Sequence, residues 1–229
     1  MRTVISRRSV RGGVLSAAVA GSLLLGATGC GGDGGEDGVP DDYKVVAGTQ
    51  LCGGDAMSAD ASKALEVITG SSRFEASAAE YTVEHAAAAL VEAYPASTVT
   101  KDVCRVFTPR GTPDFELRIT WNLADGAPTD SSAPDFTELK MGELAVAAAD
   151  KAYVFFACRN ARFSPSSASA AHIVIGVERW GMPTEPEGDV EALKDAYATV
   201  AHSVSLAMAK ELRCEKNGGL PERPVLDPA

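Results

Sequence analysis

The sequence predicts an α+β fold, in which helices pack on a mostly antiparallel sheet of about four to six strands. Alternation of apolar and polar side chains along residues 115–121 is typical of a half-buried strand. Short apolar runs rich in β-branched and aromatic residues indicate further strands at 103–107, 152–158 and 172–180. Apolar residues repeat every three or four positions in the predicted helices, at 58–69, 77–94 and 189–214. We therefore expect one folded domain spanning residues 43–214.

The helix boundaries follow from local chemistry. Ser58 is a suitable N-cap for the first helix, and Gly70 follows its end. Pro95 ends the second helix, because the residue before a proline avoids helical geometry. Asp189 is the expected N-cap of a long C-terminal helix that runs to about Cys214.

The strand predictions include one hairpin. Pro109, Gly111 and Pro113 separate the runs at 103–107 and 115–121, which favours a turn between two paired strands. Residues 144–148 suit either a strand or a helix. The tail at 215–229 contains two glycines and three prolines, so we expect it to be disordered.

The N-terminus has the composition of an export signal. Four arginines and no acidic residue occur in residues 1–29, and a short apolar stretch at 12–25 precedes small residues. The stretch is shorter than the roughly 20 apolar residues that a membrane-spanning helix needs. Residues 6–10 also resemble a twin-arginine motif, so export by either the general secretory or the twin-arginine route is expected.

The signal ends at a cysteine. The segment Leu24-Leu25-Gly26-Ala27-Thr28-Gly29-Cys30 resembles a bacterial lipobox, which implies a 29-residue signal peptide and lipid attachment, including palmitate, at Cys30. Residues 30–42 are rich in glycine and acidic side chains, as expected of a flexible tether. The resulting expectation is a lipoprotein on the outer face of the cytoplasmic membrane, with an ordinary secreted protein as the alternative.

Charge restricts the partners. The chain has 21 basic and 31 acidic side chains, for a formal net charge of −10, which becomes −14 when residues 1–29 are removed. Nucleic-acid binding requires clustered Lys and Arg, so we expect no nucleic-acid partner. An acidic domain is also repelled by anionic lipid headgroups, so we expect the membrane to be reached through the lipid anchor.

Four cysteines remain beyond Cys30, namely Cys52, Cys104, Cys158 and Cys214. An even number in an exported chain predicts disulfide bonds. We favour the sequence-local pairs Cys52–Cys104 and Cys158–Cys214, although three pairings are open. None of the spacings is that of a zinc site.

The sequence contains no recognisable catalytic motif. Nucleophile-elbow, zincin and phosphate-loop patterns are absent, so we assign no catalytic residue, metal ligand or cofactor. Trp121, Trp180 and His172 are candidates for a binding surface. A triad that joins His172 to Ser166 or Ser167 is the enzymatic alternative, while His85 and His202 are expected to be solvated.

The order of these features resembles small cell-envelope lipoproteins of actinobacteria, a group of unknown function. The resemblance is carried by the lipobox, the acidic tether, Leu51-Cys52-Gly53-Gly54, Val103-Cys104-Arg105, residues 153–158 and the final Ala-rich helix. It implies an extracytoplasmic location and an α+β fold, and it carries no catalytic residue.

Two classes of function follow from the sequence. A non-enzymatic binding or accessory module, which contacts an envelope ligand or protein, is favoured over an enzyme. A small envelope hydrolase with a Ser/His site is the alternative.

Overall fold

A computed structural model of the chain describes residues 43–96, 99–129, 133–163, 170–181 and 186–229. Helices pack on one face of a six-stranded antiparallel sheet, so the α+β prediction is confirmed. The expected signal peptide at 1–29, the lipidated Cys30 and the tether at 30–42 lie outside the described residues.

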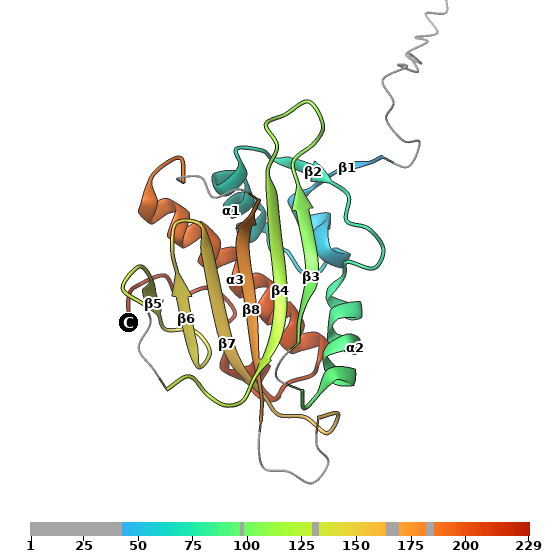
Figure 1. Cartoon of the computed structure of the whole chain (residues 1–229), viewed down its shortest axis with the longest axis vertical. Helices are drawn as coiled ribbons and strands as arrows, with labels where there is room; N and C mark the ends of the chain where they lie inside the picture. Colours follow the sequence, from blue (N-terminus) through green and yellow to red (C-terminus); the bar gives the residue numbers. More distant parts are fainter. Residues whose placement is uncertain (1–42, 97–98, 130–132, 164–169, 182–185) are drawn as a thin grey trace, which may run out of the picture. The chain divides into compact units, whose positions relative to one another are not determined.

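The main sheet has the strand order β3-β4-β8-β7-β6-β5, and every neighbouring pair is antiparallel (Figure 1). Its strands are β3 (Thr100–Phe107), β4 (Glu116–Ala124), β5 (Thr137–Leu139), β6 (Leu144–Ala147), β7 (Lys151–Cys158) and β8 (Ala171–Trp180). The predicted hairpin is confirmed as β3–β4, and the ambiguous segment at 144–148 forms β6. The β3–β4 and β7–β8 hairpins meet at the centre of the sheet, where β4 pairs with β8.

Helix α1 (Ala59–Thr69) has the predicted boundaries. The Ser58 hydroxyl accepts a hydrogen bond from the Ala61 amide at 3.0 Å, and Gly70 closes the helix at a left-handed φ of +69°. Helix α2 (Val83–Ala93) begins six residues later than predicted. Thr82 provides its N-cap, whereas Ser77, the predicted first residue, accepts a hydrogen bond from the Cys52 amide.

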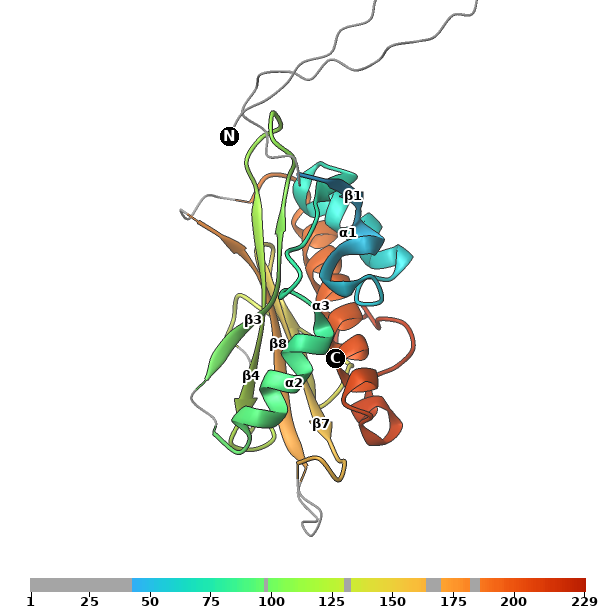
Figure 2. The ribbon, with the colours of Figure 1, turned by 90° about the vertical axis from the view of Figure 1, so that its right-hand side faces the viewer.

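Helix α3 (Val190–Glu211) begins after Asp189, whose carboxylate accepts a hydrogen bond from the Ala192 amide at 2.8 Å. Seen from the side, α1 and α3 lie against one face of the sheet (Figure 2). No helix of the described residues covers the opposite face, which is turned to the viewer in Figure 1. A short 3-10 segment (Gly48–Gly53) and a two-stranded sheet of β1 (Val45–Ala47) and β2 (Arg73–Glu75) complete the helical side.

The core lies between α3 and the covered face of the sheet. Leu117, Ile119 and Trp121 alternate along β4 and are fully buried, as the period of two predicts. Burial of each such side chain contributes roughly 1.5–3 kcal/mol. Tyr197, Val200, Val204 and Met208 of α3 are buried in the same core.

The prediction that residues 215–229 are disordered is wrong, because this tail packs against the domain. It begins with a 3-10 segment (Glu215–Gly219), and Leu220 is buried. Gly218 has a φ of +67° and packs so closely on Phe156 that a Cβ would lie 2.7 Å from its ring. The Ala229 amide donates to the Glu138 carbonyl at 2.9 Å. Glycine therefore permits close packing here, where composition alone suggested disorder.

Candidate functional site

Both predicted disulfides are present. Cys52–Cys104 joins the 3-10 segment to β3, and Cys158–Cys214 joins β7 to the residues just after α3. None of the four cysteines is more than 7% exposed. Each bond therefore ties the helical layer to the sheet from inside the domain.

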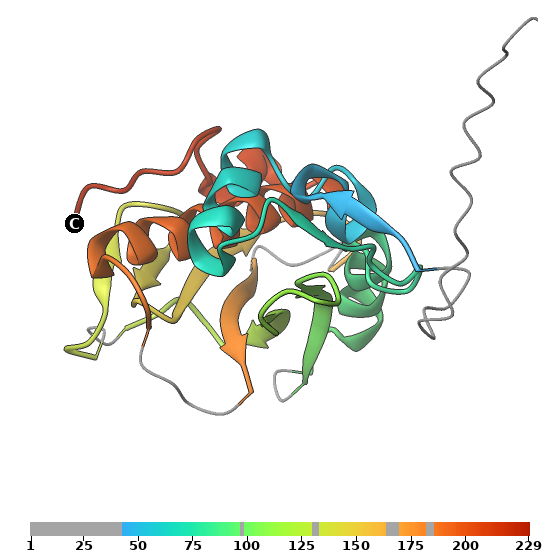
Figure 3. The same ribbon diagram turned by 90° about the horizontal axis from the view of Figure 1, so that it is seen from above.

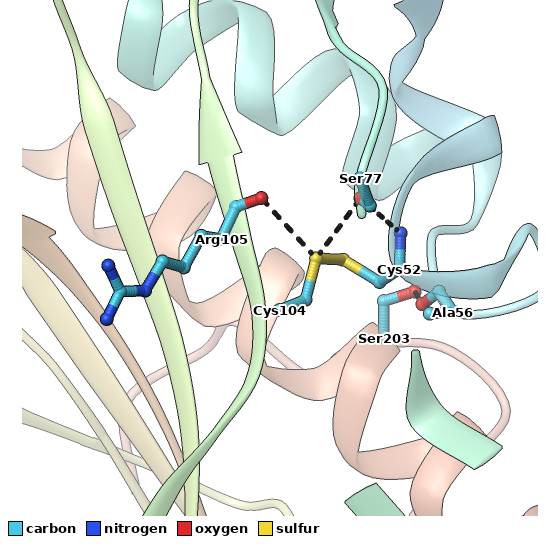
Figure 4. The surroundings of a disulfide bond; sticks show 6 residues. All are labelled: Cys52, Ala56, Ser77, Cys104, Arg105 and Ser203. Carbon is cyan, nitrogen blue, oxygen red and sulfur yellow. Dashed lines mark hydrogen bonds between the residues drawn. A yellow bond between two sulfur atoms is a disulfide. The ribbon is translucent and has the colours of Figure 1, made fainter. Parts of the chain in front are cut away.

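The surroundings of the first disulfide are polar and satisfied (Figure 4). The Ser77 hydroxyl accepts from the Cys52 amide at 3.0 Å and lies 3.6 Å from the Cys104 sulfur. Nearby, the Ser203 hydroxyl donates to the Ala56 carbonyl at 2.9 Å. Because both sulfurs are shielded, this disulfide stabilises the fold and is not accessible to a substrate thiol.

The structure does not bring the three predicted surface residues together. Trp121 faces the core and is fully buried, so it is not part of a binding surface. Trp180 and His172 share the uncovered face of the sheet but lie at opposite ends of β8. Trp180 is 48% exposed, and the Arg118 guanidinium carbon lies 4.4 Å from its ring centroid.

The histidines have separate roles. The Nδ1 atom of His172 lies 2.8 Å from a Glu143 carboxylate oxygen. His202 was expected to be solvated but is buried, and its Nε2–H donates to the Pro221 carbonyl at 2.9 Å, because the tail covers this face of α3. His85 is exposed, as expected. Ser166 and Ser167, the predicted nucleophiles, lie outside the described residues.

The uncovered face of the sheet carries paired polar groups. Asp102 accepts hydrogen bonds from both Arg105 and Arg118, and the Tyr153 hydroxyl donates to Glu178. Burial raises the pKa of Tyr153, and the bond to Glu178 raises it further. Because these groups satisfy one another, they stabilise the face and leave few donors for a ligand.

A different arrangement exists where β4 begins and β8 ends. Two adjoining hollows of about 370 and 380 Å³ share Asp114, Phe115 and Arg179. We call the larger one the Arg179 hollow; its principal lining residues are Ile68, Asp114, Phe115, Asp150, Arg179 and Tyr197. Figure 3 views the domain from this end, with α1 and the first turns of α3 beside the strand ends. A hollow of this volume suits a small-molecule ligand.

Two polar side chains of the Arg179 hollow have unused hydrogen-bonding capacity. The guanidinium of Arg179 stacks on Phe115 with 4.8 Å between its carbon and the ring centroid, but it forms no ion pair with a described carboxylate. Tyr197 is only 2% exposed, and its hydroxyl has no hydrogen-bond partner among the described residues. The side chain of Tyr197 is almost fully buried and that of Arg179 is partly buried, but the Tyr197 hydroxyl is not among the buried atoms that lack a partner, so it is open to the hollow. Both groups can therefore donate hydrogen bonds to a molecule bound there.

Electrostatics set the protonation state of the tyrosine. Burial raises the pKa of the Tyr197 hydroxyl, Asp150 raises it further, and Arg179 opposes the shift. The hydroxyl therefore keeps its proton at neutral pH and acts as a hydrogen-bond donor. The same shift indicates that Asp150 and Arg179 both lie within electrostatic reach of Tyr197.

Sequence reasoning missed this site, although one signal existed. Arg179 falls on the same face of β8 as Ile173, Ile175 and Val177, so a cation occupies a position of the apolar side. A charge at such a position requires an unusual environment. The other lining residues come from distant segments, and nothing local connects them.

The described residues contain no group of three or more His, Cys, Asp or Glu side chains that could hold a metal ion. None of their helices is long and apolar enough to cross a membrane.

No protein-family model matches the chain, and no curated protein or solved structure matches it.

Proposed function

We propose that the chain is an exported lipoprotein of the cell envelope, anchored through Cys30, whose folded domain is a non-enzymatic binding module. The export signal and lipobox support the location, as does the resemblance to actinobacterial envelope lipoproteins. Two buried disulfides also support it, because such bonds persist in oxidising compartments.

The Arg179 hollow carries the binding part of the proposal. It combines the hydroxyl of an almost buried tyrosine, a guanidinium without a carboxylate partner among the described residues, and an aromatic ring. No described residue of the hollow is a histidine, cysteine or serine. The hydroxyl of Thr69, which also lines the hollow, donates to the Leu65 carbonyl and is not bonded to a carboxylate, so no nucleophile–base pair is formed among the described residues of the hollow. This arrangement favours binding over catalysis.

Metabolic labelling tests the anchor. We expect the wild-type chain, expressed in a bacterium that processes lipoproteins, to incorporate radiolabelled palmitate and to remain with the membrane fraction. A Cys30→Ser variant is expected to lose the label, while a Cys52→Ser variant keeps it. Equal labelling of wild type and Cys30→Ser would refute lipid attachment at Cys30.

A small hydrolase is the second candidate, and one contact favours it. The 2.8 Å bond between His172 and Glu143 has the geometry of a base oriented by a carboxylate, and both side chains are partly exposed. A fluorophosphonate probe tests it. Labelling that requires both His172 and a serine of residues 164–169 would replace the binding proposal with a hydrolase.

A further inference from the structure

We propose that the Arg179 hollow binds a small zwitterion with an apolar side chain, of the amino-acid or short-peptide class. This inference rests on the proposed binding function and names its ligand. The two donors of the hollow bind the carboxylate, and the acidic side chains bind the ammonium group.

The donors match a carboxylate. The guanidinium of Arg179 is fixed by its stacking on Phe115, and the adjacent backbone is fixed because the Arg179 amide donates to the Asp150 carbonyl at 3.0 Å. A planar guanidinium binds carboxylates in two-point geometry. The Tyr197 hydroxyl adds a second donor, on a side chain that is otherwise buried and that lines the hollow. A hydrogen bond to a charged group is stronger than one between neutral groups.

A simple anion does not fit the hollow. Among the described residues that line it, Asp114, Asp150 and Glu187 are acidic and Arg179 is the one cation. Three carboxylates around one guanidinium give the lining a net negative charge, which repels a ligand that is only anionic. An ammonium group on the same ligand compensates that charge. The combination of one carboxylate and one ammonium therefore matches the lining best.

The remaining wall is apolar. Val67 is 51% exposed at the hollow, whereas Ile68 and Leu193 are buried beneath it. A branched aliphatic side chain on the ligand would cover part of Val67, and each methylene that it buries contributes about 0.8 kcal/mol. The apolar wall thus favours a leucine-like side chain.

Isothermal titration calorimetry with the full-length chain tests the ligand class. The probes are L-leucine and the dipeptide Leu-Leu, and the blocked controls are N-acetyl-L-leucine and L-leucinamide. We expect at least one probe to bind with a Kd below about 1 mM. Both blocked forms of leucine, each lacking one charge, are expected to bind at least tenfold more weakly than L-leucine if L-leucine binds. Tighter binding of L-leucine identifies the free amino acid as the ligand source, and tighter binding of Leu-Leu identifies a peptide.

Matched variants place the ligand in the hollow. Tyr197→Phe removes only a hydroxyl without a described partner, so it is expected to unfold like the wild type but to bind about tenfold more weakly. Arg179→Met is expected to reduce binding further. Tyr153→Phe and Arg118→Met change the same residue types on the uncovered face and are expected to bind as the wild type does.

Three results would overturn the inference. They are no heat of binding with either probe at about 10 mM, binding of a blocked form as tight as that of L-leucine, and unchanged binding by both hollow variants. Palmitate labelling is independent of these titrations. If the titrations fail while Cys30-dependent labelling is seen, the proposed ligand is wrong but the proposed lipid anchor stands.

Discussion

Removal of the Cys158–Cys214 disulfide is expected to lower the stability of the domain by about 4 kcal/mol. The bond closes a loop with a sequence separation of 56 residues, and the chain-entropy relation gives about 4 kcal/mol for a loop of this length. The entropy of unfolding is about 2.1 cal/mol/K per residue, so a folded unit of roughly 190 residues should lose about 10 °C in Tm. Urea unfolding of a Cys158→Ala/Cys214→Ala double variant, followed by circular dichroism, measures the loss directly.

The first disulfide provides an internal comparison. Cys52–Cys104 has a sequence separation of 52 residues, so the same relation gives nearly the same loss for Cys52→Ala/Cys104→Ala. Val67→Ala, at an exposed position, is the control and should change the free energy of unfolding by about 0.5 kcal/mol or less. Losses below about 1 kcal/mol in both double variants would show that loop closure is not how these bonds stabilise the fold.

Three further predictions concern single residues. Gly142 has a φ of +63°, and a Cβ added to it would clash with the Phe155 carbonyl. Gly142→Ala should therefore lower Tm. An unchanged Tm would contradict the close approach of these two residues. Burial lowers the pKa of His202 below its ordinary 6.5, outweighing the hydrogen bond to Pro221. The unfolded chain therefore binds more protons, and the free energy of unfolding should fall as pH drops below 6.5, an effect that His202→Asn should remove in urea titrations at several pH values. Trp180→Phe should leave only a buried tryptophan, so acrylamide quenching of fluorescence should drop sharply; persistent quenching would contradict the burial.

Local patterns predicted most of the fold. The alternation around Leu117 and Ile119 and the caps at Ser58 and Asp189 depend on neighbours a few residues away, so a single sequence reveals them. The start of α2 was predicted too early, because Ser77 is used by the distant Cys52 amide and not by the helix. His202 was placed in solvent for a related reason: nothing near it in the chain indicates that the tail returns to cover it.

The candidate site residues were also predicted only in part from the sequence. Sequence identified the four cysteines as disulfide partners and favoured their local pairing, while Trp121 and Trp180 could not be assigned to core or surface from their type alone. The strand period now explains the difference, because Trp121 shares the covered face with Ile119 and Trp180 does not.

Local sequence patterns were sufficient to predict the class of fold and the helix boundaries set by caps; export and lipid anchoring are predictions from the same kind of pattern. These depend on backbone geometry and short-range hydrogen bonds, which act within a few residues. Only the tertiary structure brought Arg179 to Tyr197 and Phe115 and folded the tail onto Phe156. Such juxtapositions arise when segments that are distant in the sequence pack around one core, so no local pattern of residues reveals them.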